Sequence, residues 1–215
     1  MILSELEIAR WIEGGESDRL DFKHQISSSQ KIAKSISAFA NTHGGSLLIG
    51  IKDNGRPVGI SVDEEEHMVA GANDLHCTPK AKIMYFPQKY LGKTILEARI
   101  LPSETEKIKA KDDDGAFKYF IRIQDKTVQA SAVIVQSWRF HRQELAITDH
   151  DIAFLKNWES SEPKTVSKLS RETRIGRNNI VKKIAKLVTL RLVDWNYHND
   201  TFYFYPAFEE EAEID

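Results

Sequence analysis

Three carboxylates occupy positions from which they could act together on one substrate. Glu16 and Asp21 lie five residues apart, and Asp53 follows the apolar run 46–51 further along the chain. Carboxylates that converge can hold a hard divalent cation such as Mg²⁺ or Mn²⁺, and such a site assists phosphoryl chemistry. The alternative is that the sequence Asp53-Asn54-Gly55 forms an ordinary tight turn with solvated side chains.

A second group of residues is basic and lies in the last third of the chain. Between residues 164 and 191 nine side chains are Lys or Arg and only Glu172 is acidic, although the whole chain carries a net charge of −2. Concentrated positive charge is the electrostatic footprint of a nucleic-acid partner, and Arg and Asn suit the edges of guanine and adenine. The alternative is a protein-interaction module with solvated lysines. The favoured contacts to nucleic acid are Lys168, Arg177, Asn178, Asn179, Lys182, Lys183 and Lys186.

The elements that must position the carboxylates can be predicted from hydrophobic periodicity. The spacing predicts a helix over 4–13, a strand within 16–24, an amphipathic helix from about 27 to 41 and a buried strand over 46–51. Because one helix connects the two strands, they are expected to be neighbours in one sheet. Further along we expect a helix over 63–76, strands at 82–86, 93–101 and 117–123, a polar loop at 102–115 and a helix over 130–138.

The basic region lies within a different pattern. Three helices are predicted at 148–158, 165–173 and 178–192, followed by two short strands at 193–197 and 201–205. Three helices and a hairpin in this order are typical of a winged helix-turn-helix, whose last helix enters the major groove with its N-terminal residues.

The run 15–23 (Gly-Glu-Ser-Asp-Arg-Leu-Asp-Phe-Lys), together with 37–45 and 48–59, resembles the Schlafen AlbA-type domain, also called the divergent AAA domain. Residues 118–123 and 128–131 resemble its closing strand motif, so the resemblance covers roughly residues 5–137. It implies an α+β domain that binds nucleic acid. In animal Schlafen proteins it also implies a metal-dependent endoribonuclease with three acidic residues, whose positions are matched here by Glu16, Asp21 and Asp53. Asp21 stands where the nuclease pattern has Glu.

These observations lead to a set of predictions. The fold class is α+β, a mixed sheet with flanking helices, plus a small winged helix. The domains are 1–140 and 145–208, followed by an acidic tail at 209–215. The favoured function is DNA binding by a transcriptional regulator that forms a homodimer. The alternative is an endoribonuclease that uses Mg²⁺ or Mn²⁺ on Glu16, Asp21 and Asp53, and no other cofactor is expected. In the first domain Lys23, Lys118 and Arg122 are candidates for phosphate contact, although a solvated sheet face would also explain them.

Bulk properties narrow the class of protein. Hydrophobic residues make up 41% of 215, which is enough for a buried core. A single cysteine, Cys77, excludes an internal disulfide, fits a reducing compartment and is expected to be buried. No apolar run is long enough to span a membrane, so we expect a cytoplasmic protein. The sequence lacks a Gly-x-x-x-x-Gly-Lys-Ser/Thr loop, which argues against ATP hydrolysis.

Overall fold

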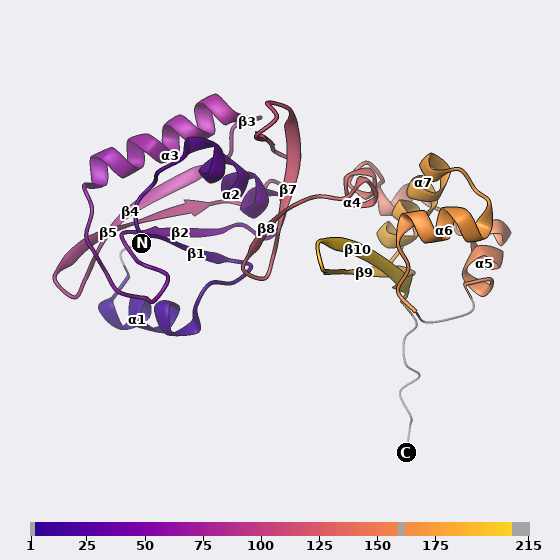
Figure 1. The fold of residues 1–215 in the computed structure, drawn as a ribbon, viewed down its shortest axis with the longest axis horizontal. Helices are drawn as coiled ribbons and strands as arrows, with labels where there is room; N and C mark the ends of the chain where they lie inside the picture. The colour runs from indigo at the N-terminus through magenta and orange to yellow at the C-terminus, as the bar shows by residue number, and fades with distance from the viewer. Residues whose placement is uncertain (1–2, 159–161, 208–215) are drawn as a thin grey trace, which may run out of the picture. The chain divides into compact units, whose positions relative to one another are not determined.

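The computed structural model describes residues 3–158 and 162–207 and divides the chain into two compact units, Met1–Ala130 and Ser131–Asp215. Both units contain helices and mainly antiparallel sheet, which confirms the α+β class (Figure 1). The predicted acidic tail lies outside the described residues. Among the helices that are described, none has the length and apolarity needed to cross a membrane.

The first unit is built on a four-stranded sheet with the order β1-β2-β5-β4. Its strands are β1 (Leu20–Lys23), β2 (Gly45–Ile49), β4 (Ile83–Tyr90) and β5 (Lys93–Ile100). β1 and β2 are parallel, with Asp21 opposite Leu47, and the other pairs are antiparallel. Helix α2 (Ser29–Asn41) makes the crossover that a parallel pair needs. The predicted adjacency of the two strands is therefore confirmed.

A second sheet of four short strands completes this unit, in the order β3-β6-β7-β8. Its strands are β3 (Cys77–Thr78), β6 (Lys109–Lys111), β7 (Phe117–Ile123) and β8 (Lys126–Gln129). The expected loop at 102–115 is thus wrong in part, because β6 lies within it. The buried side chains of Ile108 and Ala110 hold this segment in the core.

Helices cover both faces of the first sheet (Figure 1). Helix α1 (Glu5–Gly14) begins with a capping box between Ser4 and Glu7, and its residue Ile8 packs with Phe22 and Leu48. Helices α2 and α3 (Val62–His76) pack on the opposite face, where Phe39, Leu47 and Val69 belong to the main core. Cys77 belongs to the same core, and burial raises the pKa of its thiol to about 12.

Two polar side chains fix α2 to the second sheet. The Asn41 amide donates to the carbonyl oxygens of Ile108 and Phe120 at 2.7 and 2.9 Å, and its oxygen accepts from Ile108 N at 2.7 Å. The Ser37 hydroxyl donates to Ile108 O at 2.7 Å and accepts from Phe120 N at 3.2 Å. These bonds satisfy buried polar groups of two sequence-distant segments at once, so they specify how the sheet docks on the helix.

The glycine pair after α2 allows the chain to pass very close to its neighbours. Gly44 has a φ of +71°, in the left-handed region. A Cβ atom on Gly45 would overlap the Phe39 ring and lie 2.8 Å from Arg19 O. A side chain at this position would therefore force the Phe39 ring or the backbone of Arg19 to move.

The second unit contains four α-helices, a 3₁₀ turn and a hairpin among its described residues. They are α4 (Ala132–Ser137), the turn Arg142–Glu144, α5 (Asp149–Lys156), α6 (Val166–Thr173), α7 (Arg177–Thr189), β9 (Val193–His198) and β10 (Thr201–Pro206). The core contains Val133 of α4 together with Ile180 and Ile184 of α7. The helix expected at 130–138 therefore packs with the second unit, whereas the predicted first domain extended to residue 140.

The hairpin β9–β10 closes through the two residues Asn199 and Asp200, with φ of 47° and 56°. Positive φ at both central positions is the geometry of a type I′ turn, which suits a two-residue hairpin. Lys164, just before α6, forms a further bridge to Phe204 of β10, with N–O distances of 2.8 and 2.9 Å. The order of three helices and a hairpin agrees with the predicted element order.

Candidate functional site

Glu16 and Asp21 come together at the start of β1. Glu16 lies in the segment before the strand, and its Oε1 accepts a hydrogen bond from Phe22 N at 2.8 Å. This bond folds the segment back along β1 and brings the carboxylate beside that of Asp21. Burial, with a further contribution from the Asp21 carboxylate, raises the pKa of Glu16 above its ordinary value.

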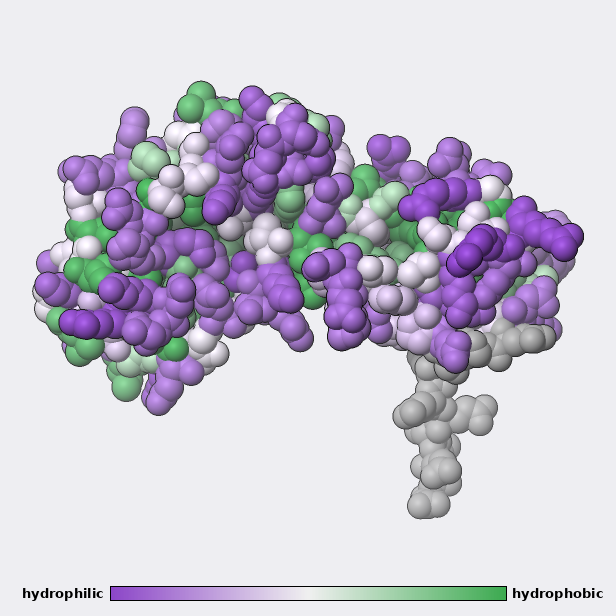
Figure 2. All heavy atoms as spheres, viewed as in Figure 1, coloured by the Kyte–Doolittle hydropathy of each residue, from purple (hydrophilic) through white to green (hydrophobic). Residues whose placement is uncertain are grey.

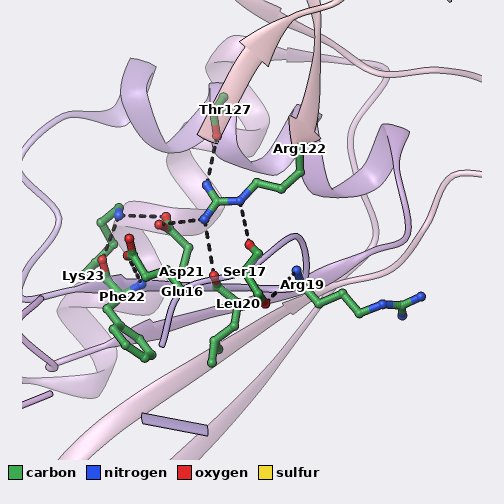
Figure 3. A network of polar contacts seen from close by, with 9 residues as sticks. All are labelled: Glu16, Ser17, Arg19, Leu20, Asp21, Phe22, Lys23, Arg122 and Thr127. Carbon is green, nitrogen blue, oxygen red and sulfur yellow. Dashed lines mark hydrogen bonds and ion pairs between the residues drawn. The ribbon is translucent and has the colours of Figure 1, made fainter. Parts of the chain in front are cut away.

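Asp21 is almost fully buried and is already paired with two cations. Its Oδ1 lies 3.2 Å from Arg122 Nη2, and its Oδ2 lies 2.7 Å from Lys23 Nζ. Figure 3 shows the carboxylate held between these two side chains. The positive charge that a metal ion would supply to this carboxylate is therefore supplied by the protein itself.

Arg122 lies in the interior, where its guanidinium has several partners. Besides Asp21 it donates to Ser17 O at 3.0 Å, Leu20 O at 3.3 Å and Thr127 Oγ1 at 3.3 Å, and it stacks on the Phe39 ring at 5.0 Å. The expectation that Arg122 contacts phosphate is not met, because the side chain is only 5% exposed and joins β7 to β1.

The other two cations predicted in this unit also have acidic partners. Lys23 is half-buried and pairs with Asp21, as described above. Lys118 lies 2.6 Å from Asp112 and 2.7 Å from Asp114 across the β6–β7 turn. These pairs give both lysines a role within the fold.

Asp53 lies apart from the two other carboxylates. It is exposed in the turn after β2, where Gly55 N donates to Lys52 O at 2.7 Å and Arg56 N donates to Asn54 Oδ1 at 3.1 Å. Within the described ranges, no group of three or more Asp, Glu, His or Cys side chains is placed to hold a metal ion. Glu16, Asp21 and Asp53 therefore do not form the three-carboxylate set that Mg²⁺ or Mn²⁺ would need.

In the second unit, α6 and α7 are joined by a three-residue turn, with Arg174 in the left-handed conformation at a φ of 57°. The length of this connection is within the range of the turns in helix-turn-helix motifs. Ile180, Ile184 and Leu187 turn one side of α7 into the core. Hydrophilic residues gather over these two helices on the face seen in Figure 2.

The predicted contact residues of this region separate into two sets. Lys183 and Lys186, which are predicted to contact phosphate, both bind the buried carboxylate of Asp151 in α5, at 3.0 and 2.5 Å, so each already has an acidic partner within the second unit. Burial alone would raise the pKa of Asp151, but the hydrogen bonds from Lys186, Thr148 and Lys183 outweigh burial and hold that pKa below its ordinary value. Sequence reasoning missed Asp151; the only local signal is the spacing Thr148-x-x-Asp151 of a capping box.

The remaining set is exposed at the beginning of α7. Arg177, Asn178, Asn179 and Lys182 are all exposed to solvent, and Arg177 Nη1 donates to Ser167 Oγ of α6 at 2.8 Å. Lys168 of α6 is partly exposed and lies 3.8 Å from Glu162. The basic side chains of Arg171 and Arg174 are exposed nearby in sequence and extend this set.

Comparison with known proteins gives a family model that matches most of the first unit. The family model described as Schlafen, AlbA_2 matches residues 16–131. No curated protein matches the chain. Among solved structures, the DIP2311 protein from Corynebacterium diphtheriae is 16% identical with a TM-score of 0.43, over 86% of this chain and 34% of that one. This chain thus spans about a third of the length of that protein.

A second solved structure is the N-terminal domain of a protein from Nitrosomonas europaea described as related to the ATP-dependent DNA helicase RecG. It is 22% identical with a TM-score of 0.44, over 69% of this chain and 97% of that one. The family match covers just over half of the sequence. The chain therefore belongs to the Schlafen AlbA_2 family.

Proposed function

We propose that the protein is a DNA-binding transcriptional regulator whose second unit is a winged helix. Membership of the Schlafen AlbA_2 family suggests nucleic-acid binding. The observation that carries the proposal is the solvent-exposed group Arg177, Asn178, Asn179 and Lys182 at the N-terminal end of α7. In a helix-turn-helix this end of the second helix meets base edges in the major groove.

The exposed group has the chemistry for this task. Arg177 offers a bidentate fork for guanine and the asparagines offer an amide for adenine, whereas Lys182 suits a phosphate. The bond from Arg177 to Ser167 holds the start of α7 against α6. Lys183 and Lys186 take no part in the proposed contact; they fix α7 to α5 through Asp151.

The test is retention of duplex DNA by the whole chain across a series of salt concentrations. The variant Arg177→Ala/Lys182→Ala should bind at least ~10-fold more weakly at moderate salt, with a salt slope reduced by about one for each phosphate that is no longer neutralised. The control Lys31→Ala/Arg56→Ala removes the same two charges from exposed positions of the first unit. Equal weakening in both variants would assign binding to net charge and overturn the role of α7.

We also infer that the regulator binds as a homodimer. Two recognition helices related by a two-fold axis match half-sites about 34 Å apart, which is one turn of DNA. Light scattering of the protein mixed with a duplex that it retains in the salt series should give two chains for each duplex. One chain for each duplex would contradict the dimer and leave the proposed contact by α7 in place.

The proposal does not extend to metal-dependent cleavage of RNA. Asp21 is engaged by Lys23 and Arg122, and Asp53 is not clustered with Glu16 and Asp21. We therefore derive no reaction step through a metal ion.

A further inference from the structure

A cavity of about 560 Å³ lies in the first unit at the C-terminal end of α1, beside the edge where β1 and β2 begin and β5 ends. Its walls include Arg10 and Trp11 of α1, Arg19 before β1, Ser46 of β2 and Arg99 of β5. The volume is within the range of small-molecule sites, roughly 300–1,000 Å³. Neither the carboxylates described above nor α7 contributes to it.

The charge of the lining has one sign. Three arginines and His43 line the cavity, and none of the described lining residues is Asp or Glu. Arg10, Arg19 and His43 are exposed, and Arg19 Nη1 donates to His43 O at 3.4 Å. A concave surface with several cations and no carboxylate raises the local concentration of anions.

Arg99, the third arginine of the lining, is held in place by a buried carboxylate. Arg99 Nε and Nη2 donate to the two oxygens of Glu97 at 2.8 and 3.2 Å. Glu97 is fully buried and also accepts from Ser46 Oγ at 2.7 Å. This pair uses the fork of Arg99 and compensates its charge, so Arg99 forms part of the wall and the cations that face a ligand are those of Arg10 and Arg19.

The remaining walls suit a flat ring. The indole of Trp11 is half-buried in the lining, and Leu101 and Pro102 supply further apolar surface to it. Aromatic side chains next to cations are the combination by which proteins bind single-stranded nucleic acid, with stacking of about 1–3 kcal/mol for each base. Arginine forks match the oxygens of a phosphate.

We propose that this cavity binds a phosphorylated nucleotide, with the phosphate on Arg10 and Arg19 and the base against Trp11. The described lining offers no carboxylate to share a Mg²⁺ ion, which disfavours a magnesium triphosphate and favours a monophosphate. The same chemistry is present in a free mononucleotide and in the 5′-phosphorylated end of a strand. This site goes beyond DNA contact by α7, because its described lining belongs to the first unit.

Calorimetric titration of the whole chain with AMP, adenosine, inorganic phosphate and a 5′-phosphorylated adenine dinucleotide tests the assignment. AMP should bind at least ~10-fold more tightly than adenosine or inorganic phosphate, because each of these lacks one of the two recognised groups. A dinucleotide that binds more tightly than AMP identifies a strand end as the source of the ligand. A dinucleotide that binds equally or less tightly identifies the free nucleotide.

Variants separate this site from general attraction of anions. Arg10→Ala/Arg19→Ala changes two exposed side chains and should weaken AMP binding at least ~10-fold, whereas Lys31→Ala/Arg56→Ala removes the same charge outside the lining and should not. Trp11→Leu should weaken AMP binding and leave inorganic phosphate unchanged. The assignment is overturned if neither AMP nor the dinucleotide binds at about 10 mM, or if the two double variants bind AMP equally.

Discussion

Arg122 shows how a single side chain can hold two sheets together. It extends from β7 to the start of β1, where its guanidinium contacts the Asp21 carboxylate and two backbone carbonyls while stacking on Phe39. All of these partners are far from Arg122 in sequence, and only its further contact with Thr127 is local. The residue therefore stabilises the arrangement of the first unit rather than presenting charge to a ligand.

Replacing Arg122 should destabilise the first unit strongly. Arg122→Leu leaves the Asp21 charge buried with only Lys23 beside it, and removal of one partner from a buried pair costs about 3–5 kcal/mol of unfolding free energy. Urea denaturation followed by circular dichroism measures the change. Lys80→Ala, which breaks an exposed pair with Asp74, serves as the control and should have a much smaller effect. Similar destabilisation in both variants would contradict the role given to Arg122.

The carboxylates Glu16, Asp21 and Asp53 lead to a second prediction about single residues. Lys23 and Arg122 pair with Asp21, and Asp53 does not cluster with Glu16 and Asp21. We therefore expect that purified protein does not cleave tRNA in the presence of Mn²⁺. Gel analysis of the wild type and of Glu16→Gln provides the measurement. Manganese-dependent cleavage that disappears in Glu16→Gln would show that the three carboxylates converge in solution and would revive the nuclease interpretation.

Among the helices, α5 and α7 are joined by one buried carboxylate and two lysines. Asp151→Asn keeps the shape and the contact with Thr148 but removes the charge that Lys183 and Lys186 bind. We expect the unfolding free energy to fall by on the order of 2 kcal/mol at pH 7, less than for a fully buried pair because each lysine side chain remains about a fifth exposed.

The pH dependence of this effect follows from the lowered pKa of Asp151. The ion pairs contribute fully above the unfolded pKa of about 3.9, and their contribution disappears as the pH falls through the lower folded pKa. The difference in unfolding free energy between wild type and Asp151→Asn should therefore shrink below about pH 4. A difference that stays constant from pH 7 to pH 3 would rule out the charge as its cause.

The junction between α2 and β2 gives a prediction about steric fit. Gly45→Ala places a Cβ against Phe39 and Arg19 O and should cost about 1–3 kcal/mol, as overpacking does. Gly71→Ala in α3 is the matched control: its Cβ meets nothing within 4 Å, and alanine is the better helix former. Thermal unfolding of both variants should shift in opposite directions. A stable Gly45→Ala protein would contradict the close approach.

Periodicity is sufficient to predict most elements but not the partners of their charges. The helices α2 and α7 follow from apolar residues at every third or fourth position, α3 follows from the acidic residues of its first turn, and the turn at Asn199 follows from its composition. Strand β6 was missed because only Ala110 of its three residues turns inward. The sequence predicts phosphate contact for Lys183, Lys186 and Arg122 because it does not reveal their acidic partners. Asp151 lies more than thirty residues from the two lysines, and Asp21 lies a hundred residues from Arg122.

At the scale of the whole molecule, each unit has its own hydrophobic core. Phe39, Leu47 and Ile100 belong to one core, and Phe154, Ile184 and Phe204 belong to the other. Separate cores predict separate cooperative transitions. Differential scanning calorimetry should show two unfolding transitions. Gly45→Ala should lower the midpoint temperature of one, and Asp151→Asn should lower that of the other. If either variant shifts both transitions together, the units unfold as one.

The residues by which the first unit is recognised are mostly structural. Ser37 and Asn41 dock a helix on a sheet, Thr42 accepts a hydrogen bond from the backbone of Arg122, and Gly45 allows a close crossing. A substitution at one of them would disturb the scaffold whatever chemistry the protein performs. Sequence searches based on these residues therefore group proteins by fold. The carboxylates of each protein found in this way must be examined before a nuclease activity is assigned to it.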